Sequence, residues 1–249
     1  MKRETVQNPL KAGEIRDLHL AVLAQMPLNL DSAKVRADLK SKTSLGRALC
    51  EFFHSRYAAQ SEFPDAASWV DFYRRIFGKE VDLANLHVPD KPDYGPEHEP
   101  CAILMVPGVT NNDAFDACKK QFDKAWRYAD DLNTVRDIVM RPEGPPEGPY
   151  VVWIKANVEA DSDLANVSAR DIESRGLNTL TLRERLTLEL KYFDETKSHL
   201  DINNWTLCAG SRYADGLVPG VSWRDGKLGV DWCGVDGVDS GLRARAAVS

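Results

Sequence analysis

The feature that most constrains the fold is a change of hydrophobic period in the C-terminal third of the chain. Thr181 and Glu184 match a helix-capping box, and apolar residues at helical spacing follow them. Residues 205–210 instead alternate as a strand does, and an Asp-Gly pair at 225–226 separates two further alternating runs. Asp-Gly favours the positive φ angles of a tight hairpin turn. The sequence therefore predicts an α+β fold, with a helix packed on a small antiparallel β-meander over residues 150–249.

Two proline-rich stretches, residues 89–100 and 142–149, divide the rest of the chain. Proline fixes φ and lacks an amide donor, so neither stretch suits a helix or a central strand. We interpret the first as a linker and the second as a long turn. The predicted organisation is a helical region over residues 1–88 and an α+β domain over residues 101–249, in which residues 101–141 form a strand–helix unit.

Apolar residues three or four positions apart predict several helices in the first region. The last of these carries an aromatic stripe, which is more often part of a core than a binding face. The residues that define the helices are Ile15, Leu18 and Val22; Val35 and Leu39; Leu45, Leu49, Phe52, Phe53 and Tyr57; and Trp69, Phe72, Tyr73, Ile76 and Phe77.

The strand–helix unit begins with a continuous apolar run at residues 101–106, which is typical of a buried strand. The helix after it is expected to carry Phe115 and Phe122 on one side and to extend as far as Trp126. A helix N-terminus after a strand can bind phosphate, but the glycine patterns of nucleotide-binding loops are missing from the sequence. Residues 150–155 predict another strand, and no cofactor is expected.

Composition places the chain among ordinary globular proteins, with 43% hydrophobic and 28% charged residues and a net charge of -6. This charge argues weakly against a surface that grips phosphate backbones, but it leaves a nucleic-acid partner open. No apolar run approaches the roughly 20 residues of a membrane span, so we expect no membrane partner. Five widely spaced cysteines favour reduced thiols and a cytoplasmic location.

The C-terminal block has a recognisable pattern of short motifs. It reads ELKYF at 189–193, HLDI at 199–202 and TLCAGSRY at 206–213, followed by Asp-Gly at 215–216 and Val-Pro at 218–219. The pattern resembles a block shared by a family of uncharacterised bacterial proteins, for which no activity is assigned. The resemblance is specific enough to place this sequence with that family, but it implies no functional residue.

The best binding candidates lie in the Gly210–Asp215 turn, which holds Ser211, Arg212, Tyr213 and Asp215. A guanidinium can grip a phosphate or carboxylate with two hydrogen bonds, and a tyrosine can stack on a base. This combination predicts recognition of an anionic partner. The structural alternative is an ion pair of Arg212 with Asp215 or Asp231.

The hypothesis that the chain is an enzyme depends on His199 and Asp201, with Glu195 as a third group. One histidine and two carboxylates can bind a divalent metal. The spacing of Glu195 and His199 needs a helix and that of His199 and Asp201 an extended chain, which a helix that ends near His199 comes close to providing. We predict no metal site. His199 capping a helix C-terminus is the simpler interpretation. Cys208 is a nucleophile candidate if His199 serves as its base, although a buried, inert thiol is commoner.

Two arginines in the tail, Arg243 and Arg245, suggest a solvated terminus or, less commonly, a phosphate contact. The distinctive residues of the C-terminal block do not include a recognisable acid–base pair or ligand cluster. We therefore favour a non-catalytic cytoplasmic binding or interaction protein, with a protein or an anionic molecule as its partner. The alternative is a hydrolase, either metal-dependent or metal-free, that uses His199 and Asp201.

Overall fold

The computed structural model of this chain describes residues 63, 65–83, 86–139 and 148–249. The chain divides into two compact units, residues 1–60 and 61–249, and the fold described below is that of the second unit. The helices predicted from Ile15 to Tyr57 lie outside the described residues.

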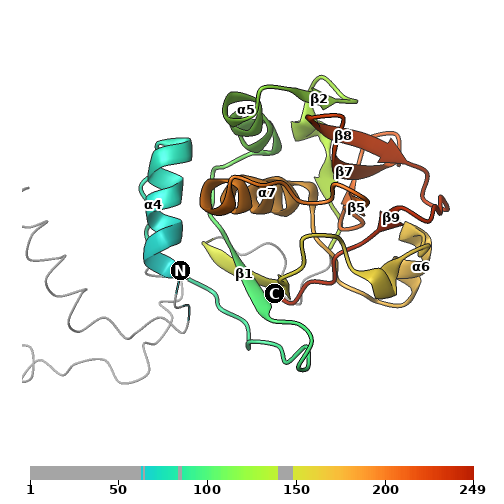
Figure 1. The fold of residues 1–249 in the computed structure, drawn as a ribbon, viewed down its shortest axis with the longest axis horizontal. Coiled ribbons are helices and arrows are strands. Elements are labelled where there is room, and N and C mark those ends of the chain that lie inside the picture. Colours follow the sequence, from blue (N-terminus) through green and yellow to red (C-terminus); the bar gives the residue numbers. More distant parts are fainter. Residues whose placement is uncertain (1–62, 64, 84–85, 140–147) are drawn as a thin grey trace, which may run out of the picture. The chain divides into compact units, whose positions relative to one another are not determined.

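The second unit has an α+β fold, as the sequence predicts. A five-stranded sheet has the order β2-β8-β7-β5-β9, and two further pairs of strands are antiparallel, β1 with β4 and β3 with β6 (Figure 1). The helices are α4 (Ala66–Phe77), α5 (Asn111–Gln121), α6 (Ala169–Ser174) and α7 (Leu182–Thr196), with short 3-10 turns η1 (Leu132–Thr134) and η2 (Ser162–Leu164). The strands are β1 (Pro100–Met105), β2 (Ala125–Arg127), β3 (Arg136–Asp137), β4 (Tyr150–Lys155), β5 (Trp205–Leu207), β6 (Ser211–Arg212), β7 (Val218–Arg224), β8 (Lys227–Cys233) and β9 (Leu242–Arg243).

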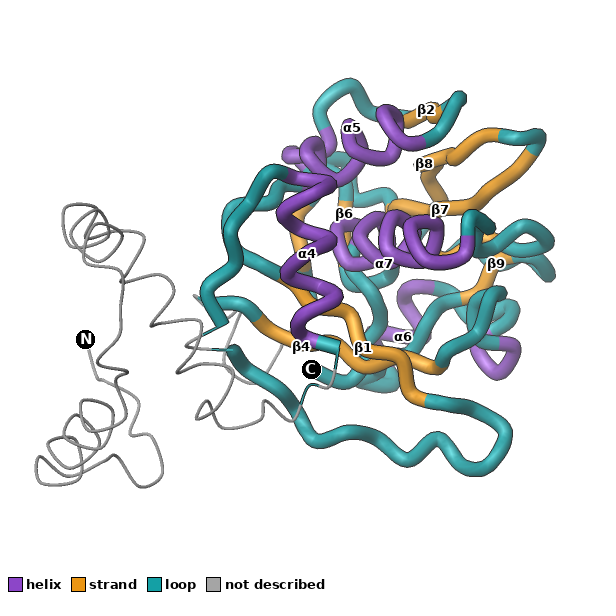
Figure 2. Tube along the Cα trace, turned by 60° about the vertical axis from the view of Figure 1, so that its left-hand side comes forward, coloured by secondary structure: helices purple, strands orange, loops and turns teal. Residues whose placement is uncertain are grey.

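Helix α7 is the centre of the unit, because it contacts α5, strand β1 and strand β7 (Figures 1 and 2). It begins at the predicted capping box: the Thr181 side chain accepts from the Glu184 amide, and the Glu184 carboxylate accepts from the Thr181 amide at 2.8 Å. Leu182, Leu186 and Leu190 then enter the main core. The predicted helix is confirmed, and it carries the buried polar side chains described below.

The predicted hairpin is also confirmed. Strands β7 and β8 pair antiparallel up to Arg224 and Lys227, and the turn between them has φ values of 52° at Asp225 and 69° at Gly226. These left-handed angles are the ones that an Asp-Gly turn favours. Strand β4 likewise occupies residues 150–155, as its apolar run predicts.

Helix α5 is shorter than predicted, and the expectation that it reaches Trp126 was wrong. It ends at Gln121, and its C-cap Phe122 is already extended, with φ -109° and ψ 143°. Residues 125–127 form β2, an edge strand parallel to β8, and the Tyr128 amide continues this pairing to the Val230 carbonyl at 2.8 Å. Pairing with a distant strand outweighed the local helical pattern.

The domain boundary that we predicted between residues 88 and 101 falls inside one compact unit. Helix α4 packs its Trp69, Phe72 and Tyr73 side chains into the core that also contains α7. The Tyr73 hydroxyl donates to the Leu104 carbonyl of β1 at 2.6 Å. The proline-rich stretch runs beside the β1–β4 pair, where the Trp153 indole donates to the Pro89 carbonyl at 3.0 Å. It connects parts of one fold.

A second, smaller apolar cluster lies between α6 and the β5–β9 end of the large sheet, with Ile172, Leu207 and Leu242 among its members. Helix α6 begins directly after its N-cap Ser168, whose side chain accepts from the Asp171 amide. None of the described helices has both the length and the apolar character needed to cross a membrane.

Candidate functional site

Ser211 of the predicted binding turn is fully buried and serves the fold. Its hydroxyl donates to Asp137 Oδ1 at 2.8 Å and accepts from the Leu182 amide at 3.0 Å. Leu182 is the first residue of α7, and its amide has no acceptor within the helix. Ser211 therefore ties the turn to the N-terminus of the central helix.

The Arg212 side chain is held by its own turn. Its Nη1 atom donates to the carbonyls of Ala209 and Ser211 at 2.8 and 2.9 Å, and Nη2 lies 3.3 Å from Glu173 Oε2. Only 13% of the side chain is exposed, and burial lowers the pKa of Arg212. These contacts favour a structural role, with Glu173 as the ionic partner in place of the predicted Asp215 or Asp231.

Tyr213 and Asp215 complete the turn differently. Tyr213 is buried, and its hydroxyl donates to the Asp231 carbonyl at 3.2 Å. Asp215 is exposed, and its Oδ1 atom accepts from the Leu217 amide at 3.1 Å. The Tyr213 ring meets the ring of Tyr128 edge-on, with centroids 5.6 Å apart. Of the four predicted residues, Asp215 is therefore at the molecular surface, and the buried Tyr213 contacts the ring of Tyr128.

Tyr128 and Trp232 are exposed, and the Tyr128 ring contacts both Tyr213 and Trp232. We call Tyr128 and Trp232, together with Asp215 and Asp231, the aromatic–acidic surface. Tyr128 is 43% exposed and Trp232 45% exposed, with ring centroids 5.9 Å apart. Burial, together with the nearby carboxylates of Asp231 and Asp215, raises the pKa of Tyr213. Sequence reasoning missed Tyr128 and Trp232, because strand alternation does not reveal which face of an edge remains uncovered.

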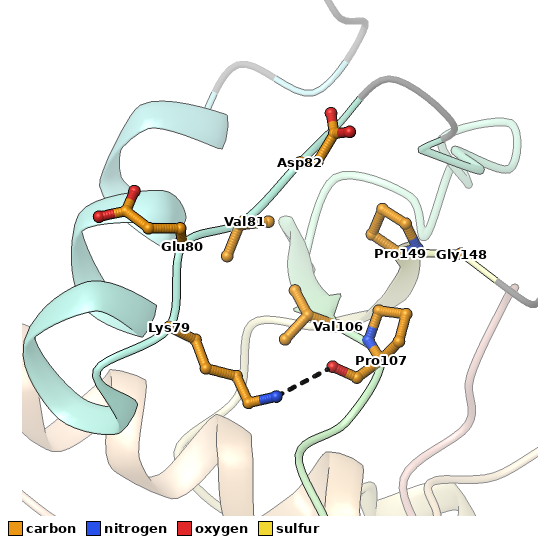
Figure 3. A pocket seen from close by; sticks show the side chains of 8 residues that line it. All are labelled: Lys79, Glu80, Val81, Asp82, Val106, Pro107, Gly148 and Pro149. Atoms are coloured by element: carbon orange, nitrogen blue, oxygen red, sulfur yellow. Dashed lines mark hydrogen bonds between the residues drawn. The ribbon is translucent and has the colours of Figure 1, made fainter. Parts of the chain in front are cut away.

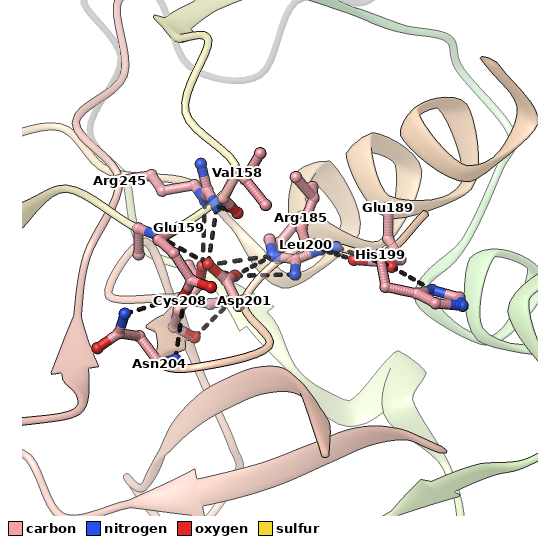
Figure 4. Close-up of polar contacts among 12 residues, drawn as sticks. Val158, Glu159, Arg185, Glu189, His199, Leu200, Asp201, Asn204, Cys208 and Arg245 are labelled. Atoms are coloured by element: carbon pink, nitrogen blue, oxygen red, sulfur yellow. Dashed lines mark hydrogen bonds and ion pairs between the residues drawn. The ribbon is translucent and has the colours of Figure 1, made fainter. Parts of the chain in front are cut away.

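His199 occupies an aromatic cage next to the end of α7. Its ring stacks on Trp223 with centroids 3.3 Å apart and on Phe193 with centroids 4.9 Å apart. The Nδ1 atom lies 2.9 Å from Glu189 Oε1, while Nε2 has no hydrogen-bond partner among the described residues (Figure 4). A carboxylate thus fixes the orientation of an imidazole whose side chain is 15% exposed.

Behind His199 lies a buried ionic network (Figure 4). Arg185 donates to Glu189 Oε2 and to Asp201 Oδ2, both at 2.8 Å, and Arg245 donates to Asp201 Oδ1 at 2.7 Å. All four side chains are fully buried, and their two positive and two negative charges balance. The Thr206 hydroxyl also donates to Asp201. Burial opposes ionisation of Asp201, but the two guanidiniums outweigh it and lower its pKa.

The predicted hydrolase residues do not converge on one centre. Asp201 bonds the two arginines and Thr206, whereas Glu195 pairs with Lys191 at 2.8 Å and is 53% exposed. No group of three or more His, Cys, Asp or Glu side chains that could hold a metal occurs among the described residues. Cys208 is buried, and burial raises the pKa of its thiol, which opposes nucleophilic chemistry.

Sequence reasoning missed the network itself. The solvated tail predicted for Arg245 was wrong, because its guanidinium is fully buried and also donates to the carbonyls of Asn157 and Val158 at 2.8 Å. The only sequence signal for the network was the spacing of Arg185 and Glu189, four residues apart on one helix.

A shallow pocket of about 300 Å³ lies elsewhere, between residues 79–82, 106–107 and 148–149 (Figure 3). Lys79 Nζ lies 3.5 Å from the Pro107 carbonyl at its edge. The pocket contains none of the predicted catalytic or binding residues and none of the residues of the aromatic–acidic surface. Its lining segments adjoin residues 84–85 and 140–147, outside the described residues, and we base no function on it.

Comparison of the chain with protein-family models, curated proteins and solved structures found no match. The aromatic–acidic surface and the His199 cage are therefore the features that indicate a function.

Proposed function

We propose that this chain is a non-catalytic binding protein that recognises a cationic group of its partner through the aromatic–acidic surface. The observation that carries the proposal is the exposure of Tyr128 and Trp232, at 43% and 45%. The Tyr128 ring contacts Tyr213, whose hydroxyl lies near the carboxylates of Asp215 and Asp231. Exposed aromatic side chains that cluster are typical of interaction surfaces. The proposed setting is the cytoplasm, on the ground of the odd number and wide spacing of the cysteines.

The sign of the partner's charge follows from the groups around the two rings. Aromatic faces attract cations, and so do carboxylates. Asp215 and Asp231 each use Oδ1 to accept a backbone amide, and neither forms an ion pair among the described residues. A lysine, arginine or quaternary ammonium group would find both kinds of attraction here. This choice replaces the anionic partner expected from Arg212, whose guanidinium bonds within the fold.

The test is calorimetric titration of the folded protein with pentalysine, with pentaglutamate as the opposite-charge probe. We expect binding of pentalysine alone, weakened about tenfold by Trp232→Ala or Tyr128→Ala, since such a loss is typical of an interface anchor. Ile202→Ala, which removes a side chain that is 52% exposed outside this surface, is the control and should leave binding unchanged. Equal binding of both peptides, no binding, or no effect of Trp232→Ala would reject the proposal.

A second candidate function is hydrolysis with His199 as general base. The observation that favours it is the 2.9 Å contact between His199 Nδ1 and Glu189, together with an Nε2 atom that has no partner among the described residues. A carboxylate-oriented imidazole can take a proton from water through its free nitrogen. The hydrolase considered from the sequence used His199 and Asp201, whereas in this candidate Glu189 supplies the carboxylate.

Nitrophenyl ester and phosphodiester substrates test this candidate. If His199 is a base, turnover should fall at least about a hundredfold in His199→Gln, the range typical of general-base removal. Glu189→Gln keeps a hydrogen-bond acceptor beside Nδ1 and should lower the rate less. Turnover that is equal in wild type and His199→Gln, or absent from both, rules out this role.

A further inference from the structure

Strand β2 lies at one end of the five-stranded sheet, and no described strand pairs with its outer edge. The Leu228 amide donates to the Lys124 carbonyl at 3.1 Å, and the Tyr128 amide donates to the Val230 carbonyl at 2.8 Å. In a parallel ladder this pattern turns the backbone groups of Trp126 towards β8. The N–H and C=O groups of Ala125 and Arg127 therefore face away from the sheet, and none has a partner among the described residues.

The opposite edge of the same sheet is covered. At β9, the Leu242 carbonyl accepts from the Asn166 amide at 3.3 Å, and Ala165 forms an antiparallel bridge with Arg243. Proteins commonly cover or interrupt sheet edges, because unpaired edges attract further strands. The β2 edge thus contrasts with β9 among the described strands (Figure 1).

Side chains hold β2 firmly in place. Arg127 donates to Asn112 Oδ1 at 3.1 Å and lies over the Phe115 ring, 4.9 Å from its centroid. Trp126 points to the other face of the strand and is 46% exposed. An anchored edge with an exposed tryptophan is preorganised for an added strand, because β2 itself loses little conformational freedom when another strand pairs with it.

We propose that the cationic partner binds as an extended peptide that adds a strand to the outer edge of β2. The inference rests on the proposed function and specifies its partner. Tyr128 directly follows β2, so the open edge leads into the aromatic–acidic surface. Backbone pairing with Ala125 and Arg127 would fix the peptide's direction, and a lysine or arginine side chain would reach the rings and carboxylates.

The probe is the capped peptide Lys-Val-Lys-Val-Lys, compared with two versions that are N-methylated either at the valines or at the central lysine. Alternate amides of a strand face opposite sides, so only one of the two methylated sets should block pairing. We expect one version to bind about tenfold more weakly and the other to bind as the parent does. Equal affinity of all three peptides, or equal weakening by both methylations, would overturn strand addition while leaving cation recognition standing.

Failure of the parent peptide to bind would instead reject the proposed function, and this inference with it. Hydrogen exchange of the protein amides gives an independent readout. The peptide should slow exchange at Ala125 and Arg127, whose amides face outward, and leave Trp126, already paired with β8, nearly unchanged. Unchanged exchange at Ala125 and Arg127 would contradict the proposal. Slowing that depends on protein concentration alone would assign the edge to a second copy of the chain and overturn the peptide assignment.

Discussion

Arg245 Nη2 lies 2.7 Å from Asp201 Oδ1, and both side chains are completely buried. The two residues approach from segments 44 positions apart in the chain. Asp201 itself has a left-handed backbone conformation, with φ 53°, which aspartate tolerates better than most residues. The pair fastens the C-terminal segment onto the loop that follows α7.

Removing the charge of Asp201 should destabilise the fold strongly. In Asp201→Asn, the guanidiniums of Arg185 and Arg245 lose their shared carboxylate while both remain buried. We expect a loss of about 3–5 kcal/mol in the free energy of unfolding, the range for breaking a buried ion pair. Urea denaturation measures it, with exposed Asp215→Asn as control. A loss equal to that of the control would contradict the prediction.

The same carboxylate should make stability depend on acid pH. Its pKa in the folded state is below the ordinary 3.8, so the unfolded chain takes up the proton first as the pH falls. The stabilisation is present above 3.8 and is lost as the pH falls through the lower, folded value. Urea denaturation at a series of acid pH values should show that the free energy of unfolding falls more steeply with decreasing pH in wild type than in Asp201→Asn. The same pH dependence in both proteins would refute this.

Arg212→Ala tests whether the turn arginine serves structure or binding. Its hydrogen bonds to two backbone carbonyls lie in a mostly buried environment, so the free energy of unfolding should fall by about 1–2 kcal/mol. Affinity for pentalysine should stay at the wild-type value. The exposed Arg224→Ala is the matched control, with an expected change below about 0.5 kcal/mol. Unchanged stability combined with lost affinity for an anionic ligand would restore the anion-binding hypothesis.

Iodoacetamide labelling should separate the cysteines by burial. Cys118 and Cys208 are buried, and burial raises the pKa of each thiol, so both should stay unlabelled at neutral pH until the protein is unfolded. Burial also raises the pKa of Cys101, to about 11, and Cys233 is the least buried of the four cysteines that the structure describes. Peptide mass mapping should therefore find Cys233 modified first among these four. Equally fast labelling of Cys208 in the folded state would revive the thiol hypothesis.

Local signals in the sequence predicted local structure well. The Thr181 capping box and the Asp-Gly turn at residues 225–226 act over a few residues, and each fixed its element as expected. The end of α5 was not predictable in this way. Its helical pattern continues to Trp126, but backbone pairing with β8, about a hundred residues later, decides the conformation there.

The candidate site was only partly predictable for a related reason. Tyr213 and Asp215 were identified from the turn, but Tyr128 reaches them from a strand 85 positions earlier than Tyr213. The pairing of His199 with Glu189 instead of Asp201 depends on how the loop after α7 folds back along the helix. Residue types indicate what chemistry is available, whereas tertiary contacts decide which groups meet.

The burial of Arg245 also determines when, during synthesis of the chain, the unit becomes fully stable. In a nascent chain that has emerged only as far as the β7–β8 hairpin, Asp201 pairs with Arg185 but lacks its second arginine, and the carbonyls of Asn157 and Val158 lack their Arg245 donor. The unit can reach its full stability only once residue 245 has left the ribosome. Until then its core is exposed to chaperones and proteases, so a chain that ends before residue 245 would have a folding defect.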